Sequence, residues 1–558
     1  MHQQKVIFLI ILLTLSFSQY SYSHEINEPK PISRDSVQFE QKQRLESEFN
    51  QRHQLKNQQN LNLDNKIVNE KTNDVCFYIK NTNILGATLL SPSIKSKLTS
   101  SYQSRCLSLS KIKSLANTIT NYYIKQGYVT SQAFIPEQDL TKQKLIITVI
   151  EGKIRSIDIE NSPPRLAKMI FPNYVGAILN LRDIEQGLEQ LNRSSSAKYT
   201  VDIQPSHKNG YSRIFVYKKS AKVPLSGQLN IDNSGVRATG KQLITGSIIV
   251  DSLLGLGEQW AFSINTDRDI THSHYSRYYA ASLYVPYGYW SYHYQLYQNK
   301  TRQPFYIANT SYPYEGKNTN QQLDISRLVY RDSKQRLTLQ GSLKHKNANT
   351  QLAQQTLEIS SPTLSSINLS PQYSTILGNG YFTFNPIFEW GISILGASPD
   401  TIAKDSPRSH YRKASLSSSY QIYLNQNIFY LTSFYGQYTT DNLYSAERIN
   451  IGGQYSVRGY QEQSLSGNCG FYWRNELNSK IANTSIGQWH LLAALDYGLI
   501  ASDAYQIEPN ALIGGATGVS FIGDSHFASR FLISKPLSYP SFLKPDNWAM
   551  YWSISFAI

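Results

Sequence analysis

The sequence lacks long apolar runs, because no stretch reaches the roughly 18 residues that a membrane-spanning helix requires. This excludes a helical integral membrane protein but not a β-barrel, in which only alternate residues face lipid. The enzyme motifs Gly-x-Ser-x-Gly and His-Glu-x-x-His are missing, and the 11 histidines do not cluster with acids. No glycine-rich phosphate-binding motif occurs either. We therefore expect neither an enzyme nor a bound cofactor.

Positive charge is in excess, but it is not concentrated. The 558 residues include 54 Lys and Arg against 39 Asp and Glu, a formal net charge of +15. A nucleic-acid-binding domain would gather such charge into a basic patch or a known motif, and neither occurs. Dispersed charge suits a polar lumen and contacts with anionic lipid head groups. We expect no nucleic-acid partner.

The amino terminus predicts export. His2 and Lys5 precede an apolar run of 12 residues, which is too short for a membrane anchor. Ser21 and Ser23 then provide small residues at the spacing of a signal-peptidase site. Residues 1–23 are therefore predicted to be a secretory signal peptide.

Cysteine is scarce, with Cys76, Cys106 and Cys469 as the three copies. Export to an oxidising compartment permits a disulfide between Cys76 and Cys106, which lie in one predicted small domain. Closing that loop could add roughly 3–4 kcal/mol to stability. No cysteine–histidine cluster has ligand spacing, so we expect no metal site, and Cys469 is left without a role.

The chain after the signal peptide starts with a polar segment. Residues 24–57 are rich in Gln, Asn and Glu and predict a helix over about 33–55, in which Leu45 and Phe49 share a face. This apolar stripe is too thin to hold a place in an ordinary core. The segment is either a disordered leader or a polar helix lodged in a water-filled lumen. Residues 58–74 have the composition of a linker.

Two small α+β domains are predicted next. Residues 75–152 show a β-α-α-β-β pattern that ends in a strand with alternating Leu145, Ile147 and Val149. Residues 153–221 repeat a similar order of strand, helix and strands. Such tandem units could bind an extended polypeptide along their strand edges, or they could act only as a spacer.

From residue 222 to 558, apolar residues recur at every second position. About 335 residues, divided by about 21 for each strand and connection, give roughly 16 antiparallel strands. A soluble β-sandwich would show the same alternation. It would not have so many long strands in an exported chain. The 40 Tyr and 7 Trp also suit the interfacial girdles of a transmembrane barrel. The last strand shows the pattern best, with apolar Trp548, Met550, Trp552, Ile554, Phe556 and Ile558 on one face.

Spaced motifs resemble one family. Val457-Arg458-Gly459-Tyr460 and Leu495-Asp496-Tyr497-Gly498 resemble the loop signature and the receiving strand of outer-membrane two-partner secretion transporters (TpsB type, haemolysin secretion/activation family). The motifs at 127–130, 136–140 and 151–154 resemble the first polypeptide-transport-associated (POTRA) domain of that family. Residues 183–192 resemble the second POTRA domain. The resemblance thus covers most of the chain.

The family implies an internal latch. A plug helix would occupy the lumen, and a loop around 452–469 would fold back into the barrel. Asp496 is then the expected bidentate partner of Arg458, with Glu476 as the second choice. As a surface residue instead, Arg458 would be worth only about 0–1 kcal/mol to a partner. The latch residues would be Val457, Arg458, Gly459, Tyr460, Asp496 and Gly498.

The family also implies a partner and a location. The POTRA domains would bind an unfolded exoprotein (a haemolysin, an adhesin or a contact-dependent toxin) in the periplasm, with Gln138, Asp139 and Leu140 as candidate contacts. The barrel would lie among the outer-membrane lipids of a Gram-negative bacterium after insertion by the outer-membrane assembly machinery. The alternative is a β-barrel assembly or insertion factor, which shares the POTRA domains and the arginine loop. A diffusion porin would not explain residues 75–221.

Overall fold

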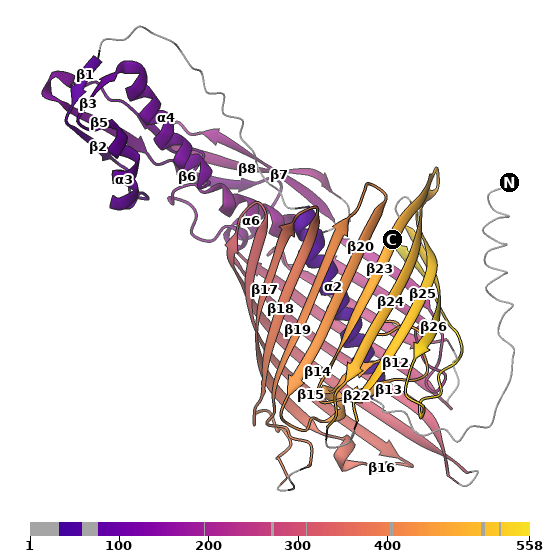
Figure 1. Cartoon of the computed structure of the whole chain (residues 1–558). Helices are drawn as coiled ribbons and strands as arrows, with labels where there is room; N and C mark the ends of the chain where they lie inside the picture. The colour runs from indigo at the N-terminus through magenta and orange to yellow at the C-terminus, as the bar shows by residue number, and fades with distance from the viewer. Residues whose placement is uncertain are drawn as a thin grey trace.

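A large barrel carries two small α/β domains at one end (Figure 1). The expected signal peptide (1–23), the expected linker (58–74) and Ile558 lie outside the residues that the structure describes. The computed structural model describes residues 33–57, 76–194, 196–221, 223–268, 273–307, 310–401, 403, 405–503, 508–523 and 526–557.

The first small domain packs two helices on short strands. Ser91 and Ser108 cap α3 (Pro92–Thr99) and α4 (Leu109–Lys125), each accepting a hydrogen bond from the backbone N–H three residues later. The core combines helically spaced side chains of α4 with alternating side chains of β5, as the sequence predicts: Ile112, Leu115, Ile119, Tyr123, Leu145, Ile147 and Val149. The strands are β1 (Cys76–Ile79), β2 (Asn81–Leu85), β3 (Arg105–Ser108), β4 (Gln132–Phe134) and β5 (Lys144–Ile150).

The second small domain is built in a similar way. Its sheet has the order β6-β8-β7 and is covered by two helices. The elements are β6 (Lys153–Ile159), α5 (Pro164–Ile170), α6 (Leu181–Asn192), β7 (Ala197–Pro205) and β8 (Tyr211–Ala221). Ile184, Leu188 and Leu191 of α6 face the core, at the spacing expected of an amphipathic helix.

Sixteen long antiparallel strands close the barrel in the described part of the chain. The last strand pairs with the first, from Ser553 opposite Asp232 to Ala557 opposite Gln228. The two-residue strand β16 (Gln355–Thr356) only extends the hairpin of β15. The long strands are β9 (Leu225–Asp232), β10 (Leu243–Asp251), β11 (Gln259–Asp267), β12 (Tyr275–Tyr287), β13 (Trp290–Ile307), β14 (Thr310–Arg331), β15 (Gln335–Leu352), β17 (Thr363–Leu377), β18 (Gly380–Gly391), β19 (Arg412–Tyr423), β20 (Ile428–Thr439), β23 (Gly470–Thr484), β24 (Gly487–Ile500), β25 (Asn510–Gly523), β26 (Phe527–Ser538) and β27 (Ala549–Ala557).

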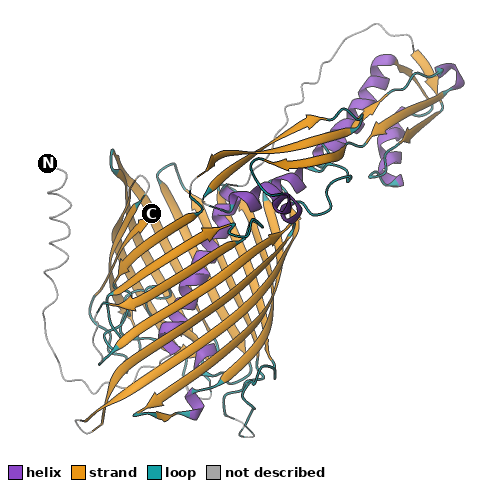
Figure 2. Ribbon diagram, turned by 180° about the vertical axis from the view of Figure 1, so that it is seen from behind, coloured by secondary structure: helices purple, strands orange, loops and turns teal. Residues whose placement is uncertain are grey.

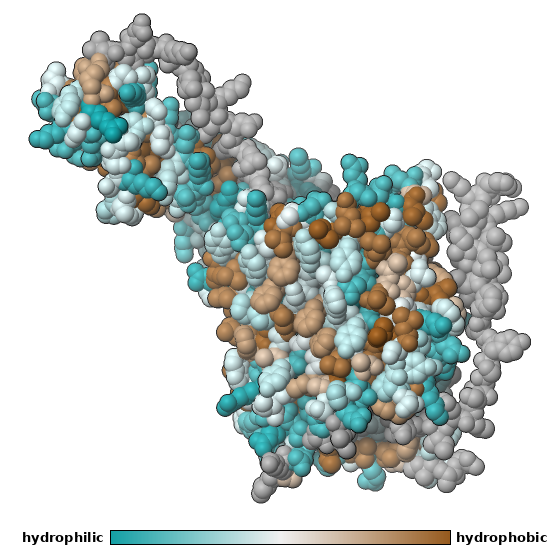
Figure 3. Space-filling model, viewed as in Figure 1, coloured by the Kyte–Doolittle hydropathy of each residue, from teal (hydrophilic) through white to brown (hydrophobic). Residues whose placement is uncertain are grey.

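The strands alternate between an apolar outer face and a polar inner face. On β14, Leu323 and Ile325 are exposed on the outside, whereas Asp324 between them is buried. On β27, Met550 is exposed and its neighbour Tyr551 is buried. Apolar groups accordingly cover much of the outer surface of the barrel (Figure 3). Such a band matches the hydrocarbon layer of a membrane.

Helix α2 (Ser33–Lys56) runs through the barrel (Figures 1 and 2). The predicted helix is thus present, and it lies in the lumen, one of the two alternatives that its polar sequence leaves open. Phe49 is 57% exposed, whereas the polar side chains of Gln41, Glu48 and Arg52 are buried. The helix packs against a polar lumen, so its polar side chains make the contacts that apolar ones make in a protein core. No described helix is long and apolar enough to cross a membrane.

A disulfide joins Cys76 of β1 to Cys106 of β3, 30 residues later. Replacing both cysteines by serine should lower the unfolding free energy of the first small domain by about 3–4 kcal/mol, because the unfolded chain gains freedom. Pulse proteolysis in urea, following cleavage within residues 76–152 of the intact protein, measures this loss. Cys469→Ser is the matched control, since Cys469 is a free thiol. An equal effect of the control would contradict the assignment.

Candidate functional site

The connection between β20 and β23 folds back into the barrel. It contains η4 (Ser445–Glu447) and a short hairpin of β21 (Ile449–Ile451) and β22 (Leu465–Gly467). Apolar burial holds it there, and Arg458 lies between two of the buried apolar residues of the loop. The shared cluster comprises Ile449, Ile451, Val457, Tyr460 and Leu465 of the loop with Tyr435, Tyr472, Ile500, Leu512 and Leu543.

Arg458 is fully buried and contacts carboxylates of two adjacent strands. Its Nε and Nη2 donate to Oδ2 and Oδ1 of Asp496 on β24, at 2.6 and 2.5 Å. Its Nη1 donates to Oε1 of Glu476 on β23, at 2.8 Å. The Arg458 backbone N–H also donates to Asp496, at 3.1 Å. The structure therefore places both predicted acids on the arginine at once, the first of them in a bidentate geometry.

Glycines let the loop tip approach the wall. A Cβ atom on Gly498 would lie 2.8 Å from Val457, and one on Gly514 would lie 1.7 Å from the carbonyl oxygen of Arg458. Gly459 has a φ of +103°, a conformation that side chains rarely adopt. The hydroxyl of Tyr460 donates to a backbone carbonyl of the wall, that of Ile513 or Ser538, each at 2.7 Å. These close approaches and the Tyr460 hydrogen bond define one position of the loop tip on the barrel wall.

Sequence reasoning missed two further arginines near the latch. Arg474 donates to Glu476 at 2.9 Å and to the backbone oxygen of Gln454 at 3.1 Å. Arg530 of β26 lies 3.9 Å from Glu476. The alternation of β23 could have revealed Arg474, because it stands two residues before Glu476 and shares its inward face. Three arginines therefore surround two carboxylates.

Helix α2 contacts both the wall and the folded loop. Gln41 donates to the backbone oxygen of Asn450 in the loop, at 2.7 Å. Arg44 donates to the Tyr472 hydroxyl at 3.0 Å, and its guanidinium lies 3.4 Å from the centre of the Tyr435 ring. Further along, Glu48 and Arg52 contact hydroxyls of β19. All these side chains are polar, so α2 can exchange its partners for water.

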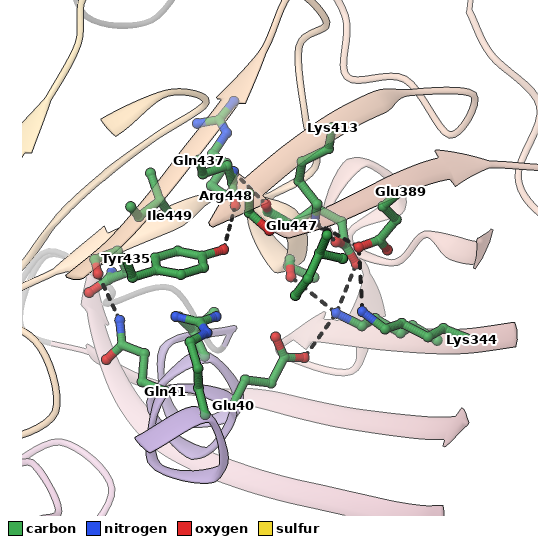
Figure 4. A pocket seen from close by; sticks show the side chains of 17 residues that line it. Glu40, Gln41, Lys344, Glu389, Lys413, Tyr435, Gln437, Glu447, Arg448 and Ile449 are labelled. Atoms are coloured by element: carbon green, nitrogen blue, oxygen red, sulfur yellow. Dashed lines mark hydrogen bonds and ion pairs between the residues drawn. The ribbon is translucent and has the colours of Figure 1, made fainter. Parts of the chain in front are cut away.

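A cavity of about 70 Å³ lies beside α2, toward the folded loop (Figure 4). It has room for a few water molecules. Charged side chains from the helix, the wall and the loop line it: Glu40, Arg44, Lys344, Lys346, Glu389, Lys413, Glu447 and Arg448.

The second small domain is fixed to the mouth of the barrel through α6. Glu189 forms ion pairs with Arg331 of β14, at 2.7 Å, and with Arg336 of β15. The Tyr289 hydroxyl donates to Asp183 at 2.6 Å. Burial raises the pKa of Asp183, although the hydrogen bond from Tyr289 opposes the rise. Burial together with the carboxylate also raises the pKa of Tyr289.

The candidate contact residues of the first small domain make local contacts. The Gln138 amide bonds both the N–H and the carbonyl of Ile146, each at 2.8 Å. Asp139 caps the short helix η2 (Leu140–Lys142), and Leu140 packs at the edge of the core. A role in binding a partner stays a prediction for these residues.

The remaining cysteine lies at the base of the folded loop. Cys469 donates through its thiol to the carbonyl of Thr439, at 3.0 Å.

Removing one member of the latch should strand a buried charge. Asp496→Asn is expected to destabilise the barrel by roughly 3–5 kcal/mol, because Arg458 would keep only Glu476 as an anionic partner. The temperature at which the barrel loses its resistance to SDS, followed by its change in gel mobility, reports this loss.

Glu315→Gln is the matched control, since Glu315 pairs with Arg302 at 3.4 Å in a half-exposed site. Its loss should cost about 0–1 kcal/mol. Equal temperature shifts in both variants would show that the latch pair stabilises the barrel no more than the half-exposed pair does.

Comparison with known proteins agrees with this architecture. A family model described as haemolysin secretion/activation protein ShlB/FhaC/HecB matches residues 210–521. Models of a ShlB-type POTRA domain and of a further POTRA domain match residues 77–152 and 153–205.

Individual relatives point the same way. The outer membrane transporter CdiB of Dickeya dadantii is 35% identical over 97% of this chain and 96% of its own length. The hemolysin transporter protein ShlB of Serratia marcescens is 30% identical over 72% of each chain. The solved structure of CdiB from Escherichia coli superposes with a TM-score of 0.89 at 32% identity, covering 96% of this chain and 100% of that one. The chain therefore belongs to the haemolysin secretion/activation protein family, ShlB/FhaC/HecB.

Proposed function

We propose that the two POTRA domains capture an unfolded exoprotein in the periplasm, that α2 then leaves the lumen, and that the exoprotein passes through the barrel to the cell surface. The family makes the chain an outer-membrane transporter of two-partner secretion, with its POTRA domains in the periplasm. The observation that carries the proposal is a closed barrel whose lumen holds a polar helix and a loop with a buried arginine.

The contacts favour α2 as the part that moves. Most of its side chains meet hydroxyls, amides and single charges, and water can replace these partners at small cost. Phe39, which packs on the rings of Tyr278 and Tyr297, is an exception. Arg458 instead shares a buried network with two carboxylates, for which water is a poor substitute. The loop thus keeps the wall of the conduit in one shape while the plug is displaced, and Arg458, Asp496 and Glu476 act as its latch.

Strand edges of the POTRA domains offer the capture site. The sheet β2-β5-β4 leaves the outer sides of β2 and β4 unpaired by other described strands, and the sheet β6-β8-β7 does so for β7, whereas the start of β6 bonds residues 176–178. An extended polypeptide could add a strand at such an edge through backbone hydrogen bonds. Gln138, Asp139 and Leu140 support this role indirectly, because they fix the segment that leads into β5.

The energy for export would come from folding of the exoprotein outside the cell, without chemistry by this chain.

Outward apolar side chains of the barrel, such as Met550 and Phe556 on the last strand, would contact lipid. They would also serve insertion of the barrel by the assembly machinery. Three relatives named CdiB match 94–97% of the chain and one named CdiB-2 matches 76%, whereas two named hemolysin transporters match 72%. We favour a partner of the kind exported by CdiB transporters over a haemolysin. The same matches disfavour a barrel assembly factor.

Export should fail when the latch is broken. Arg458→Ala and Asp496→Ala are expected to reduce secretion of the partner encoded in a neighbouring gene at least about ten-fold, because a few kcal/mol no longer hold the loop. Immunoblots of the culture medium measure this, at equal amounts of folded barrel in the membrane. Arg302→Ala, which breaks a half-exposed pair, should export normally. Wild-type export by both latch variants would rule out the proposed role of the pair.

A further inference from the structure

Three lysines of the barrel wall line the cavity beside α2 (Figure 4). One of them contacts a carboxylate of the helix. Lys346 Nζ lies 2.9 Å from Oε1 of Glu40 on the helix and 2.8 Å from Oε1 of Glu447 in the folded loop. Lys344 stands two residues earlier on the same face of β15, and Lys413 comes from β19. A single ammonium group therefore connects the helix, the wall and the loop.

Carboxylates of the wall and the folded loop pair with this lysine cluster in addition to Glu40. Glu389, opposite Lys413 in the strand ladder, lies 3.4 Å from Lys344 and 3.5 Å from Lys413. Glu447 pairs with Lys413 as well as with Lys346. Wall and loop thus supply three ammonium groups but two carboxylates, and Glu40 is the third.

The wider surroundings add further positive charge. Arg448 lines the same cavity and donates through Nε to the carbonyl of Leu443, at 2.9 Å. Arg44 lines it too, but belongs to α2 and leaves with the helix. The hydroxyls of Ser366 and Tyr411 both donate to Glu389, which fixes that carboxylate to the wall. Departure of α2 would remove Glu40 and Arg44 together, so the net charge around the cavity would not change, but Lys346 would lose one of its two carboxylate partners.

We propose that Lys346, with Lys344 and Lys413 beside it, forms a carboxylate-binding site, which Glu40 fills in the resting channel and which acidic side chains of the exported polypeptide fill after α2 leaves. This site deepens the proposed function by naming a chemical preference inside the conduit. The resting occupant is itself a carboxylate on a polar peptide segment, the same chemical group on the same kind of chain.

Lysine suits a site that must release its ligand. An ammonium group is a compact charge on a flexible stem and makes no demand for a bidentate geometry, unlike Arg458 at the latch. Side chains of Lys346 and Lys344 are 12% and 23% exposed even beside α2, so the site borders open space. In a lumen filled with water, each contact is weak and reversible. Such a site slows an acidic segment without trapping it.

Current through the full-length chain in planar lipid bilayers tests the site. Glu40→Gln serves as the background, because it removes the resting carboxylate and should raise the open probability. Unstructured Gly/Ser peptides of about 20 residues, long enough to cross the barrel when extended, are added on the POTRA side. The peptides carry Glu, Gln or Lys at the same four positions, and the dwell time of each current block is recorded.

The Glu peptide should dwell about three- to five-fold longer than the Gln peptide, as expected for one solvated ion pair. Adding Lys346→Gln should abolish this difference. Adding Lys300→Gln should preserve it, since Lys300 is exposed on β13, next to the buried residues Asn299 and Thr301. Resistance of each variant to SDS shows that the barrel is folded.

Equal dwell times for Glu and Gln peptides would overturn the proposal, and so would a difference that survives Lys346→Gln. A channel that stays closed in Glu40→Gln would refute the claim that Glu40 holds the site. Failure of every peptide to enter an open channel would instead count against the proposed export function. The two ideas can therefore fail separately.

Discussion

The buried positive charge of Arg458 is the constraint on which the rest of the barrel depends. A fully buried guanidinium is tolerated only when carboxylates and hydrogen bonds replace its water. Asp496 and Glu476 do so from adjacent strands, which fixes the register of β23 against β24. The absence of side chains at Gly498 and Gly514 gives the loop tip its place. The folded loop, the wall and the shape of the lumen follow from this one contact.

The lumen holds a second group of charge contacts, which borders open space instead of being fully buried. Lys346 meets Glu40 and Glu447 as a point charge at the edge of a cavity, and α2 supplies only one of these carboxylates. The arginine network is buried and bidentate, whereas the lysine cluster is bordered by open space. Under the proposed function, this difference would let the channel keep its loop fixed while it releases its plug. It also leaves the conduit with a local preference for acidic side chains.

Much of the architecture could be predicted from the sequence, because strands and small α/β domains follow local rules. Alternation of Leu145, Ile147 and Val149 gave the strand of the first domain, and alternation on β27 gave the two faces of the barrel. The thin apolar stripe of α2 indicated that the helix has no place in an ordinary core, and in the structure Phe49 is exposed while Glu48 is buried. The rule of amphipathic helices assumes an apolar environment, and here the environment is a polar lumen.

The charged sites differ in how much of each could be predicted from the sequence. The motif around Asp496 pointed to Arg458, and strand alternation could have added Arg474. No local pattern links Glu40 with Lys346, 306 positions away, or either of them with Glu447. Barrel closure and the folded loop bring these residues together, so their contact depends on the complete register of the strands.

The central claim is that α2 leaves the lumen during export while the latch stays closed. Two crosslinks made in the Cys469→Ser background test it directly. A short bis-maleimide joining Gln41→Cys to Asn450→Cys would hold the helix to the loop, and one joining Arg237→Cys to Glu462→Cys, whose native side chains pair at 3.8 Å, would hold the latch loop to the barrel. We predict that the first crosslink stops export of the partner and that the second preserves it. Export with α2 tethered, or loss of export with only the latch tethered, would contradict the account.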